Sequence, residues 1–500
     1  MIVREHNAHL EHDPARIVAR FFLPGDGLPS SYSRVAQIVG RVLESSAALT
    51  EQMAELVVSD LEGRHADAED LLISNARAVG SRIADASRLT EAQLLVLGAA
   101  FTAEYAVEGA ALCNPSAIEH PSQEGLGEGD LRVAIALRCI GEGHISSIGF
   151  AEAVIDAGGA WTFAPRATPL SPPTVWSGDW SRTHYARALE HEGHLSDLAT
   201  AVLGELPDRF TVAELEYALL ELPDQLSTRP DSRRPTQAMR DMAASAYRAD
   251  FTAGTPLSAR MLLPVAAEEN HGMEDARFVR FTDADGVVGY RATYTAYDGR
   301  DIAPRLITSP DLAEFAIHRL TGTGARNKGM ALFPRLVGGH HLALSRTDGE
   351  NISLAKSSDG VIWEDVGIVH PPTELWELVQ LGNCGAPIET DRGWLVLTHG
   401  VGPLRTYSLG ALLLDVDDPL RVIARTTEPL LKPTGDLRDG YVPRVAYSCG
   451  GIVHRGTLWI PVGIGDSRIR VFSVGVDELL ESMTESNPSG AAHGAVPEVW

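Results

Sequence analysis

Apolar residues recur every three or four positions between residues 30 and 110 of the chain. The pattern is clear in SYSRVAQIVGRVLESSAALTEQMAELVVSDLEG and again in EAQLLVLGAAFTAEYAVEGAAL. This spacing gathers apolar side chains on one face of a helix, and the abundant Ala, Leu and Glu favour helix. We therefore expect residues 1–110 to form an α-helical N-terminal module.

The pattern changes after residue 110 to short β-like runs. LRVAIALRCI and ISSIGFAEAVI are separated by Gly-rich turns, which is typical of strands. The Pro-rich stretch PRATPLSPPTVW then leads into a second segment with helical spacing, after which strands and turns continue almost to the end. The changes predict strands over 111–165, an α-helical insertion over 166–258, further strands over 259–482 and a loose tail over 483–500.

A weak internal repeat indicates how the strands are arranged. LITSPDLAEF, LAKSSDGVIW, LLLDVDDPLRV and FSVGVDELL each join the end of a strand to a turn. They recur roughly every 50–60 residues, which is close to the span of a four-stranded propeller blade. With residues 111–165 as the first blade, they predict a mainly β fold: a five-bladed β-propeller with an α-helical N-terminal module and an α-helical insertion.

The charge and the cysteines narrow the class of protein. The chain has 67 acidic and 42 basic residues and a formal net charge of −25, which opposes binding to nucleic acid or to an anionic membrane. The N-terminus lacks the pattern of a secretory signal, and no apolar run is long enough to span a membrane. The cysteines are scattered and lack metal-ligand spacing. We expect a cytoplasmic protein with reduced thiols and no metal.

One acidic pair is a candidate for chemistry. In NHGMEDARFVRF, Glu274 and Asp275 lie just before an apparent strand. Strand starts converge on the axis of a propeller, where a carboxylic acid could protonate a glycosidic oxygen. An acidic pair before a strand is more often a solvated turn, so the pair alone leaves both interpretations open.

An ordered series of motifs surrounds this pair. Upstream are CNPSAIEH and IALRCIGEGHISSIGF; downstream are TYTAYDG, RNKGMALFP, LSRTDGENISLAKSSDGVIW, GWLVLTHGVG and YSLGALLLDVDDPLRVIARTTEPLL. In content and order the series resembles glycoside hydrolase family 130, the β-mannoside phosphorylases and β-mannosidases. The resemblance covers residues 110–165 and 260–480 and neither helical region.

The resemblance implies an inverting phosphorylase that uses no cofactor and takes inorganic phosphate as co-substrate. Asp275 would be the single protein acid, and phosphate would attack the anomeric carbon of a β-mannoside to give α-mannose 1-phosphate. The matched positions imply a phosphate cradle of Arg326, Asn327, Arg346, His399 and Tyr407, with the adjacent Lys328 as a further donor. They imply sugar recognition by Asn114, Ser116, Arg138, His144 and Asp298.

Departures from the family pattern keep alternatives open. Ala276 stands where the family has proline, and Tyr441 stands where an aspartate would grip a mannose hydroxyl. Glu374 and Glu377 are either solvated loop charges or the base of an inverting β-mannosidase. A non-catalytic sugar-binding propeller is the third alternative.

The helical regions would cap the pocket or mediate self-association. The expected partners are an oligosaccharide and phosphate, without nucleic acid or membrane, and a homo-oligomer is left open.

Overall fold

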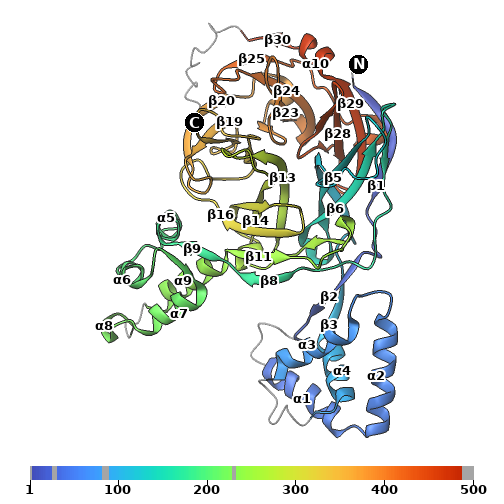
Figure 1. Cartoon of the computed structure of the whole chain (residues 1–500), viewed down its shortest axis with the longest axis vertical. Helices are drawn as coiled ribbons and strands as arrows, with labels where there is room; N and C mark the ends of the chain where they lie inside the picture. The colour runs from blue at the N-terminus through green and yellow to red at the C-terminus, as the bar shows by residue number, and fades with distance from the viewer. Residues whose placement is uncertain (1–2, 25–30, 81–88, 228–231, 487–500) are drawn as a thin grey trace.

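The structure is a computed structural model that describes residues 3–24, 31–80, 89–227 and 232–486. Its fold is mainly β, as predicted. The prediction of a loose tail over 483–500 falls largely on residues 487–500, which lie outside the described residues. In Figure 1 the sheets follow one another around the upper part of the molecule, with α10 (Val476–Ser482) at the top beside them, and the other helices lie lower. No helix among the described residues is long and apolar enough to cross a membrane.

The first two groups of strands are joined into one large sheet. Antiparallel strands β4 (Ala111–Glu119), β5 (Leu131–Ile140), β6 (Ser146–Ile155) and β7 (Trp161–Phe163) form the first group. The second group is β13 (Gly272–Thr282), β14 (Val288–Tyr297), β15 (Ile302–Ser309) and β16 (Glu314–Arg319). A parallel pairing of Gly272 with Ser146 links β13 to β6, so residues distant in sequence meet there.

The remaining strands form three further antiparallel groups. β17 (Ala331–Leu332), β18 (His341–Ser345), β19 (Ile352–Ser357) and β20 (Glu364–His370) make one sheet. β21 (Gln380–Asn383), β23 (Gly393–Gly402), β24 (Thr406–Leu414) and β25 (Val422–Arg425) make the next, with β22 (Ile388–Thr390) and β30 (Thr484–Glu485) paired to it. The last contains β26 (Ala446–Tyr447), β27 (Ile452–His454), β28 (Thr457–Ile464) and β29 (Arg468–Gly475).

The N-terminal segment differs from the expectation of a wholly helical module. β1 (Arg4–Glu11) pairs antiparallel with β29, so the start of the chain completes the sheet built from its end. Exposure alternates along β1, because every second side chain of a strand faces the sheet's packed side. The run is too short and too polar for its alternation to compete with the helical spacing that follows it.

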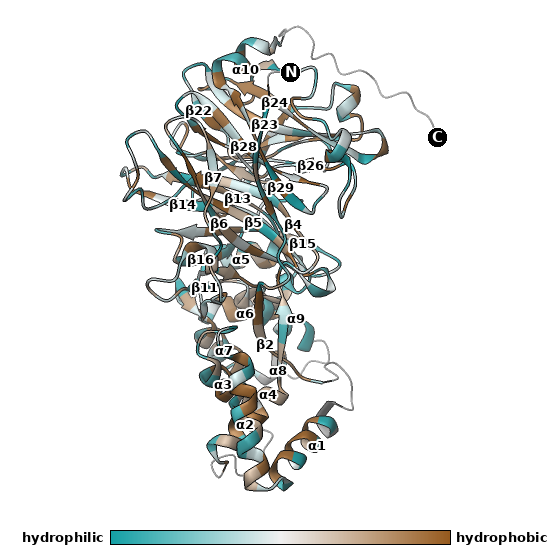
Figure 2. Ribbon diagram, turned by 90° about the vertical axis from the view of Figure 1, so that its right-hand side faces the viewer, coloured by the Kyte–Doolittle hydropathy of each residue, from teal (hydrophilic) through white to brown (hydrophobic). Residues whose placement is uncertain are grey.

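The N-terminal helices form a bundle separated from the sheets. α1 (Ser31–Glu44), α2 (Ala47–Leu61), α3 (Ala68–Gly80) and α4 (Glu91–Ala100) are joined to the rest by the ribbon of β2 (Ile17–Phe21) and β3 (Thr102–Ala106). Thr90 begins α4 with a capping box to Gln93, which satisfies backbone donors at the helix start. Figure 2 shows apolar and polar residues alternating around α2, as the spacing predicts for an amphipathic helix.

The insertion contains helices and also extends a sheet. Its helices are α5 (Arg182–His191), α6 (Asp197–Glu205), α7 (Val212–Leu220), α8 (Asp224–Ser227) and α9 (Arg233–Ala244), with a ribbon of β9 (Asp179–Ser181) and β10 (Arg209–Thr211). β8 (Thr174–Ser177) and β11 (Tyr247–Asp250) flank the helices, and β11 pairs with β16. Backbone pairing therefore fixes both ends of the insertion to the second group of strands.

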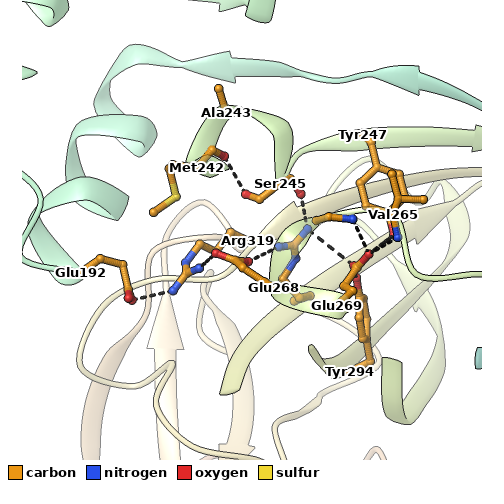
Figure 3. A network of polar contacts seen from close by, with 12 residues as sticks. Glu192, Met242, Ala243, Ser245, Tyr247, Val265, Glu268, Glu269, Tyr294 and Arg319 are labelled. Atoms are coloured by element: carbon orange, nitrogen blue, oxygen red, sulfur yellow. Dashed lines mark hydrogen bonds and ion pairs between the residues drawn. The ribbon is translucent and has the colours of Figure 1, made fainter. Parts of the chain in front are cut away.

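A buried ion network adds a second attachment (Figure 3). Arg305 of β15 is fully buried, lies 2.5 Å from Glu268 and donates to the backbone carbonyl of Ser245 at the end of α9. Arg319 of β16 pairs with Glu268 and lies 2.5 Å from Glu192, which follows α5. The backbone N–H of Val265 and the Tyr247 and Tyr294 hydroxyls donate to the carboxylate of Glu269.

Replacing Arg305 by alanine tests the importance of this network. The change leaves Glu268 and Glu269 partly uncompensated in a buried position, so we expect Arg305→Ala to lower the free energy of unfolding by about 3–5 kcal/mol. Urea unfolding followed by tryptophan fluorescence measures it. The matched control is Arg187→Ala, which removes an exposed pair with Glu190 and should cost at most about 1 kcal/mol. Equal effects of the two changes would contradict the interpretation.

Candidate active site

A cavity of about 470 Å³ collects charged side chains from the different sheets. Its titratable lining residues are Arg138, Asp275, Lys328, Arg346, His399, Arg405, Tyr407, Tyr447 and Asp466. Asn114 and Gln380 add amides, and Val442, Pro443 and Val445 add apolar surface. The sheets thus hold side chains from residues 114 to 466 around one space.

Local irregularities of the strands direct two of these side chains. β4 changes register between Cys113 and Ser116, and Asn114 has a φ of 50°. β13 changes register between Glu274 and Arg277, and Asp275 has a φ of 57°. A non-glycine residue rarely adopts such a backbone, and bulges of this kind often re-aim side chains beside active sites. Here they bring the side chains of Asn114 and Asp275 into contact.

Asp275 is held by donors on several sides. The Asn114 amide donates to its Oδ1, and Nη1 of Arg138 lies 3.2 Å from the same oxygen. Nη1 of Arg277 donates to the Asp275 backbone carbonyl at 2.9 Å. Burial opposes ionisation, but Arg138, Arg277 and Lys328 outweigh it and hold the pKa of the carboxyl below its ordinary value. Asp275 is therefore a carboxylate in the unliganded cavity.

The cations of the cavity differ in whether a carboxylate lies close enough to balance their charge. Nζ of Lys328 lies 2.7 Å from Glu274, which also binds Arg138 at 2.7 Å. Arg346, in contrast, has no carboxylate within salt-bridge distance among the described residues. Burial lowers the pKa of its guanidinium below the ordinary value. A largely buried cation without a counter-ion favours an anion brought in by a ligand.

His399 lies beside Arg346. Its Nε2 is 3.4 Å from Nη1 of Arg346, and burial together with that cation holds the pKa of the imidazole well below 6.5. His399 is consequently neutral near pH 7. Since the guanidinium can only donate, Nε2 accepts and the ring proton is assigned to Nδ1. The ring of Tyr407 lies nearly parallel to the imidazole at 6.2 Å between centroids, and the ring of Tyr447 packs against it edge-on at 4.7 Å.

Seven of the predicted site residues line this cavity: Asp275, Lys328, Arg346, His399, Tyr407, Asn114 and Arg138. The other predicted residues lie elsewhere. Arg326 is exposed. Burial lowers the pKa of His191 at the end of α5, and the charge of Arg326 adds to that lowering. The Oδ1 of Asn327 accepts from the backbone N–H of Lys328, so its side chain shapes the turn.

The three other residues predicted to bind sugar also lie outside the lining of this cavity. Ser116 is fully buried, and its hydroxyl accepts from the backbone N–H of Phe278, so it joins β4 to β13. His144 lies outside the cavity and hydrogen-bonds with the Tyr441 hydroxyl. Asp298 accepts from two backbone N–H groups of its own turn and lines a different cavity.

Sequence reasoning missed Asp466, Arg405 and Tyr447. Asp466 occupies the turn between β28 and β29 with a φ of 47°. Burial raises its pKa from 3.8 to about 6, against the opposing effect of Arg138. The hydroxyl of Tyr447 accepts from Nη2 of Arg277 at 2.7 Å. The available signal for Asp466 was an aspartate in a glycine-flanked turn, GIGDSRIR, within the matched part of the chain.

The glutamates that could have served a hydrolase point elsewhere. Glu377 is buried, and its carboxylate accepts from the backbone N–H groups of Thr373 and Glu374, within its own turn. Glu374 lies 2.5 Å from Arg425. Neither glutamate lines the cavity. No cluster of three or more potential metal ligands occurs within the described ranges.

A carboxylate, several cations and tyrosine hydroxyls in one cavity can supply a proton and bind an anion. A family described as beta-1,4-mannooligosaccharide phosphorylase, glycoside hydrolase family 130, matches residues 255–485. A 1,2-beta-oligomannan phosphorylase of Thermoanaerobacter is 35% identical over 209 residues, covering 41% of this chain and 68% of that protein. The chain therefore belongs to glycoside hydrolase family 130, and the resemblance of its motifs is confirmed.

Two further relatives extend the comparison. A beta-1,2-mannobiose phosphorylase of Listeria innocua is 29% identical over 232 residues, covering 44% of this chain and 63% of that protein. The solved structure of the beta-1,2-mannobiose phosphorylase from Listeria innocua with beta-1,2-mannobiose has a TM-score of 0.43 at 19% identity, covering 76% of this chain and 93% of that one. At the level of the family, the prediction of an enzyme of the glycoside phosphorylase type is confirmed.

The raised pKa of Asp466 makes a prediction about stability. The unfolded chain ionises this group above about pH 4, whereas the folded chain retains the proton up to about pH 6. Ionised Asp466 therefore costs stability as the pH rises through 6, and Asp466→Asn removes that cost. The gain of the variant over the wild type should be larger at pH 8 than at pH 4.5 by about 2 kcal/mol.

Denaturant unfolding of both proteins at the two pH values measures the difference. The control is Asp285→Asn, which removes a carboxylate from an exposed turn. A gain that is equal at both pH values, or larger at pH 4.5, would show that Asp466 ionises normally in the folded chain.

Proposed function

We propose that the protein is an inverting phosphorylase that cleaves β-mannosides with inorganic phosphate. The products would be α-mannose 1-phosphate and a shortened acceptor sugar. The observation that carries the proposal is Arg346, a largely buried guanidinium to which the described residues offer no carboxylate partner, in the same cavity as the carboxylate of Asp275. The names of the relatives, which are mannoside phosphorylases, support the same reaction.

The proposal includes the five-bladed propeller. Five antiparallel groups of strands are seen among the described residues, and each of them contains or adjoins residues that line the cavity. β1 and β29 come from opposite ends of the chain, and their pairing is the kind of closure that joins the last blade to the first. In this arrangement the cavity would lie at the opening of the ring.

In the proposed reaction the cations hold phosphate. Arg346, Arg405 and Lys328 would neutralise the dianion, while His399 and Tyr407 would complete its hydrogen bonds. A phosphate oxygen forms a bond to the anomeric carbon as the glycosidic C–O bond breaks. The acceptor oxygen receives the proton of Asp275, directly or through a sugar hydroxyl.

The acid must gain its proton before it can donate it. Asp275 is a carboxylate in the unliganded cavity because Arg138, Arg277 and Lys328 favour the charged form. A bound phosphate would partly neutralise Lys328 and add negative charge nearby, and both effects raise the pKa of Asp275. Protonation of the acid would thus be linked to phosphate binding. After proton transfer, Asn114 and Arg138 stabilise the carboxylate that forms.

Sugar recognition would fall to the acidic end of the cavity. Asn114, Arg138 and Asp466 offer an amide, a guanidinium and a carboxyl to the hydroxyls of the glycone. Asp466 is also the one other carboxylate lining the cavity within the described chain, so a hydrolytic reaction would have to use it as the base. Arg346, which has no carboxylate partner in the described part of the chain, favours phosphorolysis over that alternative.

The reaction itself is tested with β-1,2- and β-1,4-linked manno-oligosaccharides, with and without phosphate. We expect α-mannose 1-phosphate to form only with phosphate, and Asp275→Asn to lower kcat by about 10²–10⁴, the usual contribution of a general acid. Ion chromatography separates sugar phosphate from free mannose. Release of free mannose without phosphate would move the assignment to a hydrolase, and binding without turnover would move it to a sugar-binding protein.

Arg346 tests the phosphate cradle separately. Loss of a hydrogen bond to a charged group costs about 1.5–3 kcal/mol, so Arg346→Ala should raise the KM for phosphate about 10- to 100-fold. The KM for the oligosaccharide should change much less. Arg346→Lys keeps the charge without the paired donors, so its KM for phosphate should lie between those of the wild type and Arg346→Ala. An unchanged KM for phosphate in Arg346→Ala would refute the assignment.

A further inference from the structure

A second cavity, of about 710 Å³, lies between the helical insertion and the second group of strands. One wall comes from α9 and the turn after α5, including Asp241, Arg234 and His194. The other comes from the start of β15 and the turn before it, including Asp301 and Ile302. The volume is within the range of about 300–1,000 Å³ that small-molecule sites occupy. The insertion and the strands therefore border an open space large enough for a ligand.

The lining has the chemistry of a site for a neutral, hydroxyl-rich ligand. Carboxylates, guanidiniums and an amide supply both acceptors and donors, and Met242 and Ile302 supply apolar surface. The acidic groups outnumber the arginines in the lining, which opposes binding of a polyanion. Planar polar groups beside apolar surface match the hydroxyls and the C–H face of a sugar ring.

The wall of this cavity is held in place by the ion network of Figure 3. Arg319 lines the cavity, is almost fully buried and binds Glu192 and Glu268, which line it as well. Arg305 also binds Glu268, so the two arginines balance the two glutamates and their geometry is fixed before any ligand arrives. Asp241 has no cation within salt-bridge distance among the described residues, and Gln237 donates to its Oδ1 at 2.8 Å. Asp241 thus retains acceptor capacity.

A short stretch of chain connects the linings of the two cavities. Lys328 lines the catalytic cavity, and its Nζ lies 5.8 Å from the ring centroid of Tyr297. The residue after Tyr297 is Asp298, which lines the second cavity. On the same side, Arg326 lies close enough to α5 for its charge to lower the pKa of His191, whose burial is the larger cause. The end of β14 and the segment 326–328 therefore link residues near both cavities.

We propose that the second cavity binds further sugar units of the oligosaccharide whose terminal unit occupies the catalytic cavity. The proposal rests on the proposed function, which supplies the oligosaccharide. It assigns a role to the helices of the insertion, α5 to α9, which lie outside the matched residues 255–485. Longer substrates would gain binding from both cavities, whereas a disaccharide would use only the catalytic one.

Chain-length dependence tests this proposal. For the wild type, kcat/KM should rise from the disaccharide to the tetra- and pentasaccharide of the preferred linkage. Asp241→Ala should lower kcat/KM for the pentasaccharide about five- to tenfold, the loss of one or two hydrogen bonds. It should leave the disaccharide within twofold. The control Glu205→Ala changes an exposed acid of α6 that does not line the cavity, and it should alter neither substrate.

A binding measurement separates this proposal from the catalytic one. Titration calorimetry of the pentasaccharide into Asp275→Asn, with and without Asp241→Ala, requires no turnover. Weaker binding with Asp241→Ala, for the pentasaccharide but not for the disaccharide, supports the second site even if phosphorolysis fails. Equal affinity of both proteins for the pentasaccharide, an equal loss for both lengths, or no binding of either sugar would overturn it.

Discussion

The candidate site depends on the ion pairs that Arg138 forms with neighbouring carboxylates. The guanidinium of Arg138 contacts Glu274 and Asp275, its charge acts on Asp466, and its Nε donates to Ser146, the residue at which β6 meets β13. Burial opposes its charge, but the carboxylates outweigh burial and raise the pKa of the guanidinium. Without this cation, carboxylates would crowd a buried space and repel one another. One arginine therefore joins two groups of strands and makes the acidic cavity possible.

The same charge balance explains why the site favours an anion. Lys328 is balanced by Glu274, and Arg138 by Glu274 and Asp275, whereas Arg346 has no such partner among the described residues. Neutral His399 beside it adds hydrogen-bonding capacity without adding charge that would repel the guanidinium. A ligand anion would complete the balance and at the same time shift Asp275 toward its acid form. The charge of phosphate would thus raise the pKa of Asp275, while one of its oxygens would form the new bond to the sugar.

The sequence was sufficient to predict most of the strands and helices, and its motifs included Asp275, which lines the cavity. Periodicity located the helices of both regions, and ordered motifs located the residues that line the cavity from β4, β5, β13, β23 and β24. It was insufficient for turns, where one dihedral angle decides the direction of a side chain. Arg326 and Lys328 are two residues apart, yet only Lys328 lines the cavity. Asp466 was missed for the same reason, because its turn gives it a direction that no spacing rule encodes.

One short segment of chain, residues 268–275, links the helical insertion to the candidate acid: it begins with two glutamates of the ion network and ends with Asp275. Glu268 and Glu269 lie just before β13, which carries Glu274 and Asp275. Arg305 forms ion pairs with both Glu268 and Glu269. Arg319 forms an ion pair with Glu268. A buried ion network holds its members in a narrow range of positions, because displacing one leaves the others uncompensated. The anchor that fixes the insertion therefore also fixes the start of the strand that presents the acid. A sugar chain bound to the insertion would therefore act on this network, whose nearest member in sequence, Glu269, is six residues before Asp275.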